Sequence, residues 1–136
     1  MDYTISLATA DRRRSLAFYR DGLGLEAFGP PADDGVPEPL QLRLTSSVSL
    51  MMIPTGGFSW VAGEERVAAP GANECVLSLS APDEDAVRAR YETAVAAGGT
   101  AVSEPSQREW GAFAAQVADP DGHLWMILIV PPDWTP

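Results

Sequence analysis

The sequence predicts an α+β fold in which two βαβββ units share one core. The expected order of strand, helix and three strands occurs twice, with an offset of about 72 residues between the candidate helix N-caps Asp11 and Asp83. The stretch Asp119–Gly122 stands between two apolar runs, which is typical of a tight turn that closes a β-hairpin. At 136 residues, the chain is expected to form a single domain, 1–136.

The first unit covers residues 1–54. Apolar and polar side chains alternate over residues 3–9, which predicts a strand. A helix is expected from Asp11 to about Asp21, because apolar residues recur there at helical spacing and Gly22 follows as a stop signal. Further strands are expected at 25–28, 40–44 and 48–53.

Residues 55–73 are expected to be a connecting loop, and the second unit covers residues 74–131. A strand at 74–80 precedes the helix that Asp83 caps, and Gly98 ends that helix. The next strand is expected at 100–102, a loop at 103–111, and strands on either side of the closing turn. Residues 132–136 form a tail, and the sequence leaves open whether Trp134 in it contacts a partner or stays mobile.

Composition excludes several classes of function. The net charge is −10 and the chain has no lysine, so nucleic acid is not expected as a partner. The acidic charge favours a cationic ligand, although solubility alone explains it too. No apolar run reaches the length of about 18 residues that a membrane helix requires, and the N-terminus lacks a signal peptide. The single cysteine, Cys75, forms no internal disulfide, which fits a cytoplasmic location.

Motifs along nearly the whole chain resemble one superfamily. They are Asp11, Ser15, Phe18-Tyr19 and Gly22-Leu23-Gly24 in the first unit, Ala96–Thr100 at the end of the second helix, and Trp110-Gly111 with Ala118–Trp125 at the closing hairpin. With these motifs the chain is similar to the vicinal oxygen chelate superfamily, which includes glyoxalase I, extradiol dioxygenases and antibiotic-binding proteins of the bleomycin-resistance type. The resemblance implies a curved, mostly antiparallel sheet with helices on its outer face and a site on its concave face. It also implies a homodimer, in which the modules pair within one chain or across two.

Metal-dependent members of this superfamily bind one divalent ion through four positions on the concave face. By motif matching, these positions carry Thr4, Met51, Val76 and Met126. None of these side chains is a good ligand for Zn²⁺, Ni²⁺, Fe²⁺ or Mn²⁺. We therefore expect no metal and no other cofactor, as in the metal-free antibiotic-binding members.

No catalytic residue can be identified from the pattern. By strand parity, the single histidine, His123, and Cys75 are expected on the helix-facing side, with Cys75 buried as a small hydrophobe. A nucleophilic Cys-His pair is therefore disfavoured. The acidic residues cluster in helix starts and loops, where capping and solvation explain them.

The concave face has the composition of a binding pocket, with small polar residues and adaptable methionines. Large rings in the loops could clamp a planar ligand at its mouth, or could instead seal a dimer interface or the edge of the core. The candidate ligand-binding residues are Arg43, Met51, Phe58, Trp60, Ser78, Trp110, Gln116 and Met126.

The leading hypothesis is a metal-free small-molecule-binding protein that sequesters an aromatic or cationic natural product and so confers antibiotic resistance. The alternative is a lyase, isomerase or dioxygenase-like enzyme of the same superfamily. A third possibility is an interaction module or sensor without small-molecule chemistry, which bulky side chains filling the concave face would favour.

Overall fold

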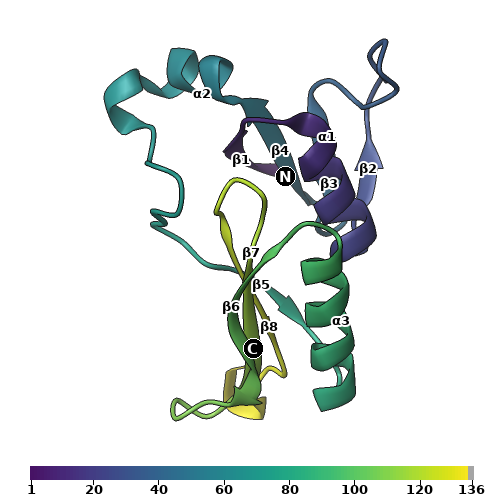
Figure 1. Cartoon of the computed structure of the whole chain (residues 1–136), viewed down its shortest axis with the longest axis vertical. Coiled ribbons are helices and arrows are strands. Elements are labelled where there is room, and N and C mark those ends of the chain that lie inside the picture. Colours follow the sequence, from purple (N-terminus) through teal and green to yellow (C-terminus); the bar gives the residue numbers. More distant parts are fainter. Residues whose placement is uncertain (135–136) are drawn as a thin grey trace.

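A computed structural model describes residues 1–134, and Thr135 and Pro136, which end the expected tail, lie outside the described residues. Two modules follow one another along the long axis of the molecule (Figure 1). Each module forms its own four-stranded mixed sheet, and helices pack beside the sheets. The α+β fold class with two βαβββ modules is thereby confirmed.

The first module begins with β1 (Tyr3–Thr9), followed by α1 (Arg12–Leu16) and the π-helix η1 (Ala17–Gly22). Its remaining strands are β2 (Glu26–Phe28), β3 (Leu40–Arg43) and β4 (Val48–Pro54). The strand order is β1-β4-β3-β2, with β1 parallel to β4 and antiparallel pairs elsewhere. Asp11 is the N-cap, as expected, because its carboxylate accepts hydrogen bonds from the backbone N–H groups of Arg13 and Arg14.

The second module repeats this topology. It contains β5 (Leu77–Ser80), α3 (Glu84–Ala96), β6 (Thr100–Gln107), β7 (Phe113–Ala118) and β8 (Leu124–Leu128). The strand order is β5-β8-β7-β6, with β5 parallel to β8. The closing hairpin is confirmed as β7 and β8, and the tail contains the short helix η3 (Pro132–Trp134).

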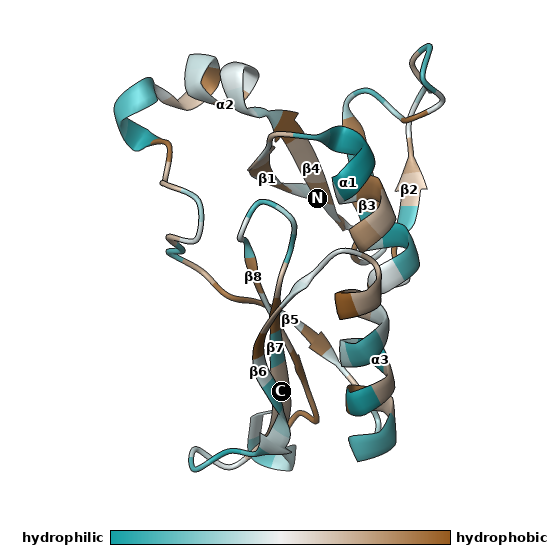
Figure 2. Ribbon diagram, in the orientation of Figure 1, coloured by the Kyte–Doolittle hydropathy of each residue, from teal (hydrophilic) through white to brown (hydrophobic). Residues whose placement is uncertain are grey.

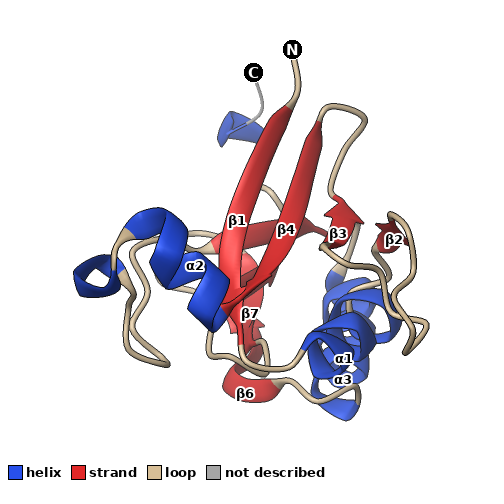
Figure 3. Cartoon of the chain, turned by 90° about the horizontal axis from the view of Figure 1, so that it is seen from above, coloured by secondary structure: helices blue, strands red, loops and turns tan. Residues whose placement is uncertain are grey.

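The connector between the modules was expected to be a loop, but it contains α2 (Thr55–Ala62) and η2 (Glu64–Arg66). Two adjacent glycines, Gly56 and Gly57, weaken the helical signal of α2 in the sequence. No residue of α2 is buried, so no apolar stripe marks a buried face either. From above, α2 lies on the opposite side of β1 and β4 from α1 and α3 (Figure 3).

Two strand boundaries differ from expectation. β6 continues through residues 103–107, which were expected to be a loop, because register shifts against β7 break the alternation that marks a strand. β5 begins only at Leu77, so the preceding residues belong to the end of the connector. The expectation that Cys75 is buried is therefore wrong, and its side chain is exposed.

One apolar core joins the two modules. Tyr19 on η1 packs edge-on against Trp125 on β8, with ring centroids 5.8 Å apart. The helices meet closely, because a Cβ atom added to Gly22 would lie 3.1 Å from the Cα atom of Ala94 on α3. Hydrophobic residues concentrate on β4 and β5, whereas α3 mixes hydrophilic and hydrophobic positions (Figure 2). The helices thus cover one face of each sheet and leave the other face outside the shared core.

Candidate functional site

The closing turn fixes the two modules relative to one another. Asp121 accepts a hydrogen bond from the Ala10 N–H at 2.8 Å, which links the turn to the end of β1. His123 Nε2 lies 2.7 Å from the Ala8 carbonyl oxygen and, as the protonated nitrogen, donates to it. His123 therefore has a structural partner in the first module. His123 also lines the space between the connector and the closing turn, so its expected place on the helix-facing side stays a prediction.

A buried carboxylate lies at the centre of this turn. The Tyr19 hydroxyl donates to Asp119 Oδ2 at 2.6 Å, and Asp119 Oδ1 accepts from the N–H groups of Asp121 and His123. Burial raises the pKa of Asp119, although the hydrogen bond from Tyr19 opposes the shift. Burial, with the nearby Asp119 charge as a second cause, raises the pKa of Tyr19 well above its ordinary value.

Each sheet has a face that does not pack against the core, which we call its open face. Strand pairing decides its members, because successive side chains alternate between the two faces. The open face of the first sheet carries Thr4, Ser6, Gln41, Arg43, Ser49 and Met51. The open face of the second sheet carries Ser78, Ser80, Ala114, Gln116, Met126 and Leu128.

The four positions that motif matching assigns to the metal ligands of related proteins lie on or beside the open faces. Thr4 and Met51 lie on the first open face, Met126 lies on the second, and Val76 just precedes β5 with 45% of its surface exposed. Their side chains offer one hydroxyl group and two thioethers, which bind the hard or borderline divalent ions weakly. Residues 1–134 contain no group of three or more His, Cys, Asp or Glu side chains that could hold a metal ion.

The candidate ligand-binding residues of the first sheet, Arg43 and Met51, already contact other residues of the protein. Arg43 Nε donates to Glu26 Oε2 at 3.0 Å, and its guanidinium lies 4.9 Å from the centre of the Phe28 ring. Met51 is half-buried in β4 and pairs with Gln41 across the sheet. Arg43 is thus held at the sheet surface by a carboxylate and a ring rather than presented as a free charge.

The second sheet brings three candidates into direct proximity. Met126 on β8 pairs with Ser78 on β5 and with Gln116 on β7. Met126 also packs against a small apolar cluster on the same face, formed by Ala112, Ala114 and Leu128. This open face therefore combines an apolar patch with a hydroxyl and an amide, which suits an amphipathic ligand.

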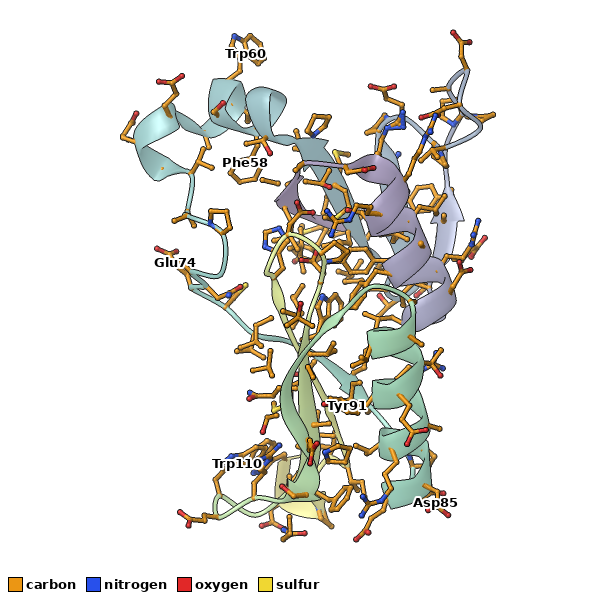
Figure 4. All side chains as sticks on the ribbon, in the orientation of Figure 1. Phe58, Trp60, Glu74, Asp85, Tyr91 and Trp110 are labelled. Atoms are coloured by element: carbon orange, nitrogen blue, oxygen red, sulfur yellow. The ribbon has the colours of Figure 1, made fainter. Side chains whose placement is uncertain are left out.

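The candidate aromatic residues fall into two groups at opposite ends of the molecule (Figure 4). Phe58 and Trp60 lie on α2, where Trp60 is 87% exposed. Trp110 lies at the far end of the second module and stacks on Trp134, with ring centroids 5.8 Å apart and an interplanar angle of 15°. The eight candidate ligand-binding residues of one chain therefore do not all surround a single ligand.

Sequence reasoning missed two features of this region. The sequence did not indicate which residue Trp134 contacts, because its contact with Trp110 depends on the fold of the tail. The connector was treated as a loop with two aromatic residues, but it also encloses a cavity with the closing turn.

Comparison with known proteins gives the same fold. A hypothetical protein SA1046 from S. aureus shares 24% identity with a TM-score of 0.77, covering 96% of this chain and 92% of that chain. A glyoxalase-related enzyme from Fulvimarina pelagi shares 26% identity with a TM-score of 0.80, covering 96% and 88%. A glyoxalase/bleomycin resistance protein/dioxygenase family enzyme from Burkholderia phytofirmans PsJN shares 18% identity with a TM-score of 0.76, covering 94% and 97%.

No curated protein matches the chain. Within the described part of the chain, no helix has the length and apolar character needed to cross a membrane. The profile of the Glyoxalase/Bleomycin resistance protein/Dioxygenase superfamily matches residues 3–127, which is most of the chain. The resemblance seen in the sequence is thereby confirmed, and the chain belongs to this superfamily.

Proposed function

We propose that this protein is a metal-free member of its superfamily that binds and sequesters an aromatic or cationic small molecule, such as an antibiotic. The observation that carries the proposal is the chemistry of Thr4, Met51, Val76 and Met126. Motif matching assigns these residues to the positions of the superfamily's metal ligands, and none of their side chains replaces an imidazole or a carboxylate.

Two further features support a binding role. The second open face joins Met126 to Ser78 and Gln116, so an apolar patch lies beside hydrogen-bonding groups. The stacked rings of Trp110 and Trp134 offer a flat surface, and indole rings attract planar molecules and cations. The net charge of −10 would also attract a cationic ligand from a distance.

A fluorescence titration tests this proposal. Three of the four tryptophans are exposed and the fourth, Trp125, is buried, so a ligand on the surface should quench part of the emission. The panel should include bleomycin-like and polycyclic natural products. Replacing Trp110 with Ala should weaken binding with little loss of stability, because 48% of the surface of Trp110 is exposed. Absence of quenching across the panel would count against sequestration.

Metal content provides the second test. Protein purified without chelator should contain well under one divalent ion per chain by elemental analysis. About one bound ion per chain would contradict the metal-free proposal. A Met51→Glu/Met126→Glu variant should still bind no ion tightly, because Thr4 and Val76 supply no imidazole to complete the site.

We further propose a homodimer in which a second copy covers the open faces. Several open-face residues, among them Thr4, Ser6, Ser78 and Ser80, are exposed in the single chain, and a sheet face alone makes a poor pocket for a small ligand. A two-fold axis is the commonest symmetry for such pairs. Light scattering should give twice the mass of one chain, and the mass of a single chain would contradict this part of the proposal.

An enzyme is the second candidate. The likeness to the glyoxalase-related enzyme from Fulvimarina pelagi favours a lyase, isomerase or dioxygenase-like activity on a small molecule. Bound metal together with turnover would favour this candidate over sequestration.

A further inference from the structure

A cavity of about 840 Å³ lies between the connector, the end of β1 and the closing turn. The connector leaves β4, runs out along α2 and returns to β5, as Figure 1 shows. Small-molecule pockets usually measure about 300–1,000 Å³, so the cavity has the size of a binding site. Of the eight candidate residues from the sequence, Phe58 alone lines it.

The connector is anchored to the body of the protein at its two ends. At one end, the Thr55 hydroxyl donates to the Thr9 carbonyl oxygen at 3.2 Å. At the other end, the Asn73 amide donates to the Gly122 carbonyl oxygen and accepts from the Leu124 N–H. Among the described residues, the hydrogen bonds made by 56–72 stay within the connector. The roof of the cavity is therefore a strap whose hydrogen bonds to the body of the protein lie at its two ends.

A backbone contact strengthens the second anchor. Gly122 has φ +93°, and a Cβ atom at this position would lie 2.6 Å from the Gly71 nitrogen. The strap thus meets the closing turn where only glycine fits. This contact sets the distance between roof and floor at that end of the cavity.

The wall of the cavity is mostly apolar. Phe58 lines it from α2, whereas Trp60 points away from the body, as expected for two residues 200° apart on a helix (Figure 4). Leu7, Leu77 and Leu124 contribute aliphatic side chains from the strands.

Several polar side chains of the wall already have partners within the protein. Asn73 is engaged with the closing turn, and His123 Nε2 contacts the Ala8 carbonyl oxygen. Asp121 accepts from the Ala10 N–H and from the Ser15 hydroxyl. A ligand therefore finds few free hydrogen-bonding side chains, and its binding would depend largely on apolar contact.

Charge adds little attraction at this wall. Glu65 and Arg66 pair with each other at 3.1 Å, and Glu74 points outward from the connector (Figure 4). An anion would gain no free cationic partner here and would meet the acidic field of the whole protein.

We propose that this cavity is a second binding site, separate from the open faces, for an uncharged and largely apolar small molecule. The connector acts as a strap over the ligand, and Phe58 contacts it from α2. The site does not depend on the sequestering function proposed for the open faces.

The neutral dye Nile red is a suitable probe, because its emission rises in apolar surroundings. We expect saturable binding at one dye per chain, and weaker binding of the anionic dye 8-anilinonaphthalene-1-sulfonate. Phe58→Ala should weaken Nile red binding by about threefold to tenfold, since it removes apolar contact area. Trp60→Ala is the matched control on the same helix and should leave the affinity unchanged.

The single cysteine allows the site to be blocked selectively. Cys75 lines the cavity and is exposed, so N-phenylmaleimide should modify it and fill part of the space. This adduct should abolish saturable Nile red binding. The control is the Cys75→Ser/Ser78→Cys variant, whose adduct lies on the second open face and should leave Nile red binding intact.

Three outcomes would overturn the proposal. In the first, Nile red binds the Cys75 adduct as well as it binds the unmodified protein. In the second, binding is lost only when the new cysteine of the Cys75→Ser/Ser78→Cys variant is modified, which would place the dye on the second open face. Cys75 could resist modification until a dimer is diluted, which would show that a second copy occupies the cavity. Failure of the proposed sequestration affects none of these results, because that function is tested with the natural-product panel and the Trp110→Ala variant.

Discussion

At the scale of single residues, the contact between Tyr19 and Asp119 links the two modules most directly. The two residues are 100 positions apart in sequence, and both side chains are fully or almost fully buried. Trp125 Nε1 donates to the same Tyr19 hydroxyl at 3.3 Å. A carboxylate without donors would be costly at this depth, so the phenol and two backbone N–H groups are needed to keep Asp119 inside the protein.

The Tyr19→Phe substitution tests how much the Tyr19 hydroxyl contributes to stability. It leaves the buried Asp119 and the indole N–H of Trp125 each without one partner, while the ring still fills its place. We expect the free energy of unfolding to fall by about 1–3 kcal/mol. Urea denaturation measures the change, and Tyr3→Phe is the control because 59% of Tyr3 is exposed. Equal stability of the two variants would show that the buried hydrogen bond contributes nothing.

The raised pKa of Asp119 gives stability a pH dependence with a definite sign. Because burial raises the pKa of the folded state above its ordinary value, the folded protein binds this proton more readily than the unfolded chain. Asp119 should therefore add stability as the pH falls from neutral towards the unfolded pKa. The stability of the native protein relative to Asp119→Asn should rise as the pH is lowered from 7 to about 4, the ordinary pKa of an aspartate carboxyl, in urea titrations. A constant difference over this range would contradict the assignment.

At the scale of elements, the packing of η1 against α3 depends on the absence of a side chain at Gly22. A methyl group there would press against the Cα atom of Ala94 and the Cβ atom of Ala97, each 3.1 Å away. Both neighbours belong to α3 or to its C-cap, so they can give way only if the helix moves.

Gly22→Ala should accordingly destabilise the protein by about 1–3 kcal/mol through overpacking. Gly56→Ala is a matched control, because Gly56 lies in α2 with nothing within 4 Å of its added Cβ atom. That change should be neutral or should stabilise the helix by up to about 1 kcal/mol. Thermal unfolding followed by circular dichroism compares the two variants. A loss of stability in Gly56→Ala as large as that in Gly22→Ala would rule out the steric explanation.

Local sequence predicted the regular elements best. Asp11 and Asp83 cap their helices as expected, and Asp119–Gly122 closes the hairpin, because each signal acts within a few residues. The helix α2 was missed because it buries no residue and contains two glycines. The end of β6 was missed because its pairing with β7 shifts register, and a partner strand cannot be seen in local alternation.

At the scale of the whole molecule, the sequence predicted which residues lie on open faces but not which of them meet. Strand parity placed Met51 and Met126 correctly on such faces, since the period of two is a local property. The distance between the α2 aromatics and Trp110 depends on how the modules are arranged along the long axis (Figure 4). That arrangement follows from the shared core and the closing turn, which join residues about 100 positions apart.

The shared core also predicts how the modules behave when the connector is cut. Core residues of both modules, such as Phe18 and Val117, belong to one buried cluster, so neither module can expose its helix-facing side without a large loss of apolar burial. A specific protease site inserted between Gly63 and Glu64 would cut the chain in an exposed segment. After cleavage under native conditions, the two fragments should elute together by size exclusion and unfold in one transition.

The insertion itself should change the uncut protein little, because the hydrogen bonds of this segment stay within the connector. A Gly22→Ala variant carrying the same site provides the comparison, since a weaker contact between η1 and α3 should let its fragments separate at a lower urea concentration. Tryptophan fluorescence and circular dichroism should give coincident transitions in the uncut protein, because Trp125 lies where the two modules meet. Fragments that separate without denaturant would mean that the connector, rather than the core, holds the modules together.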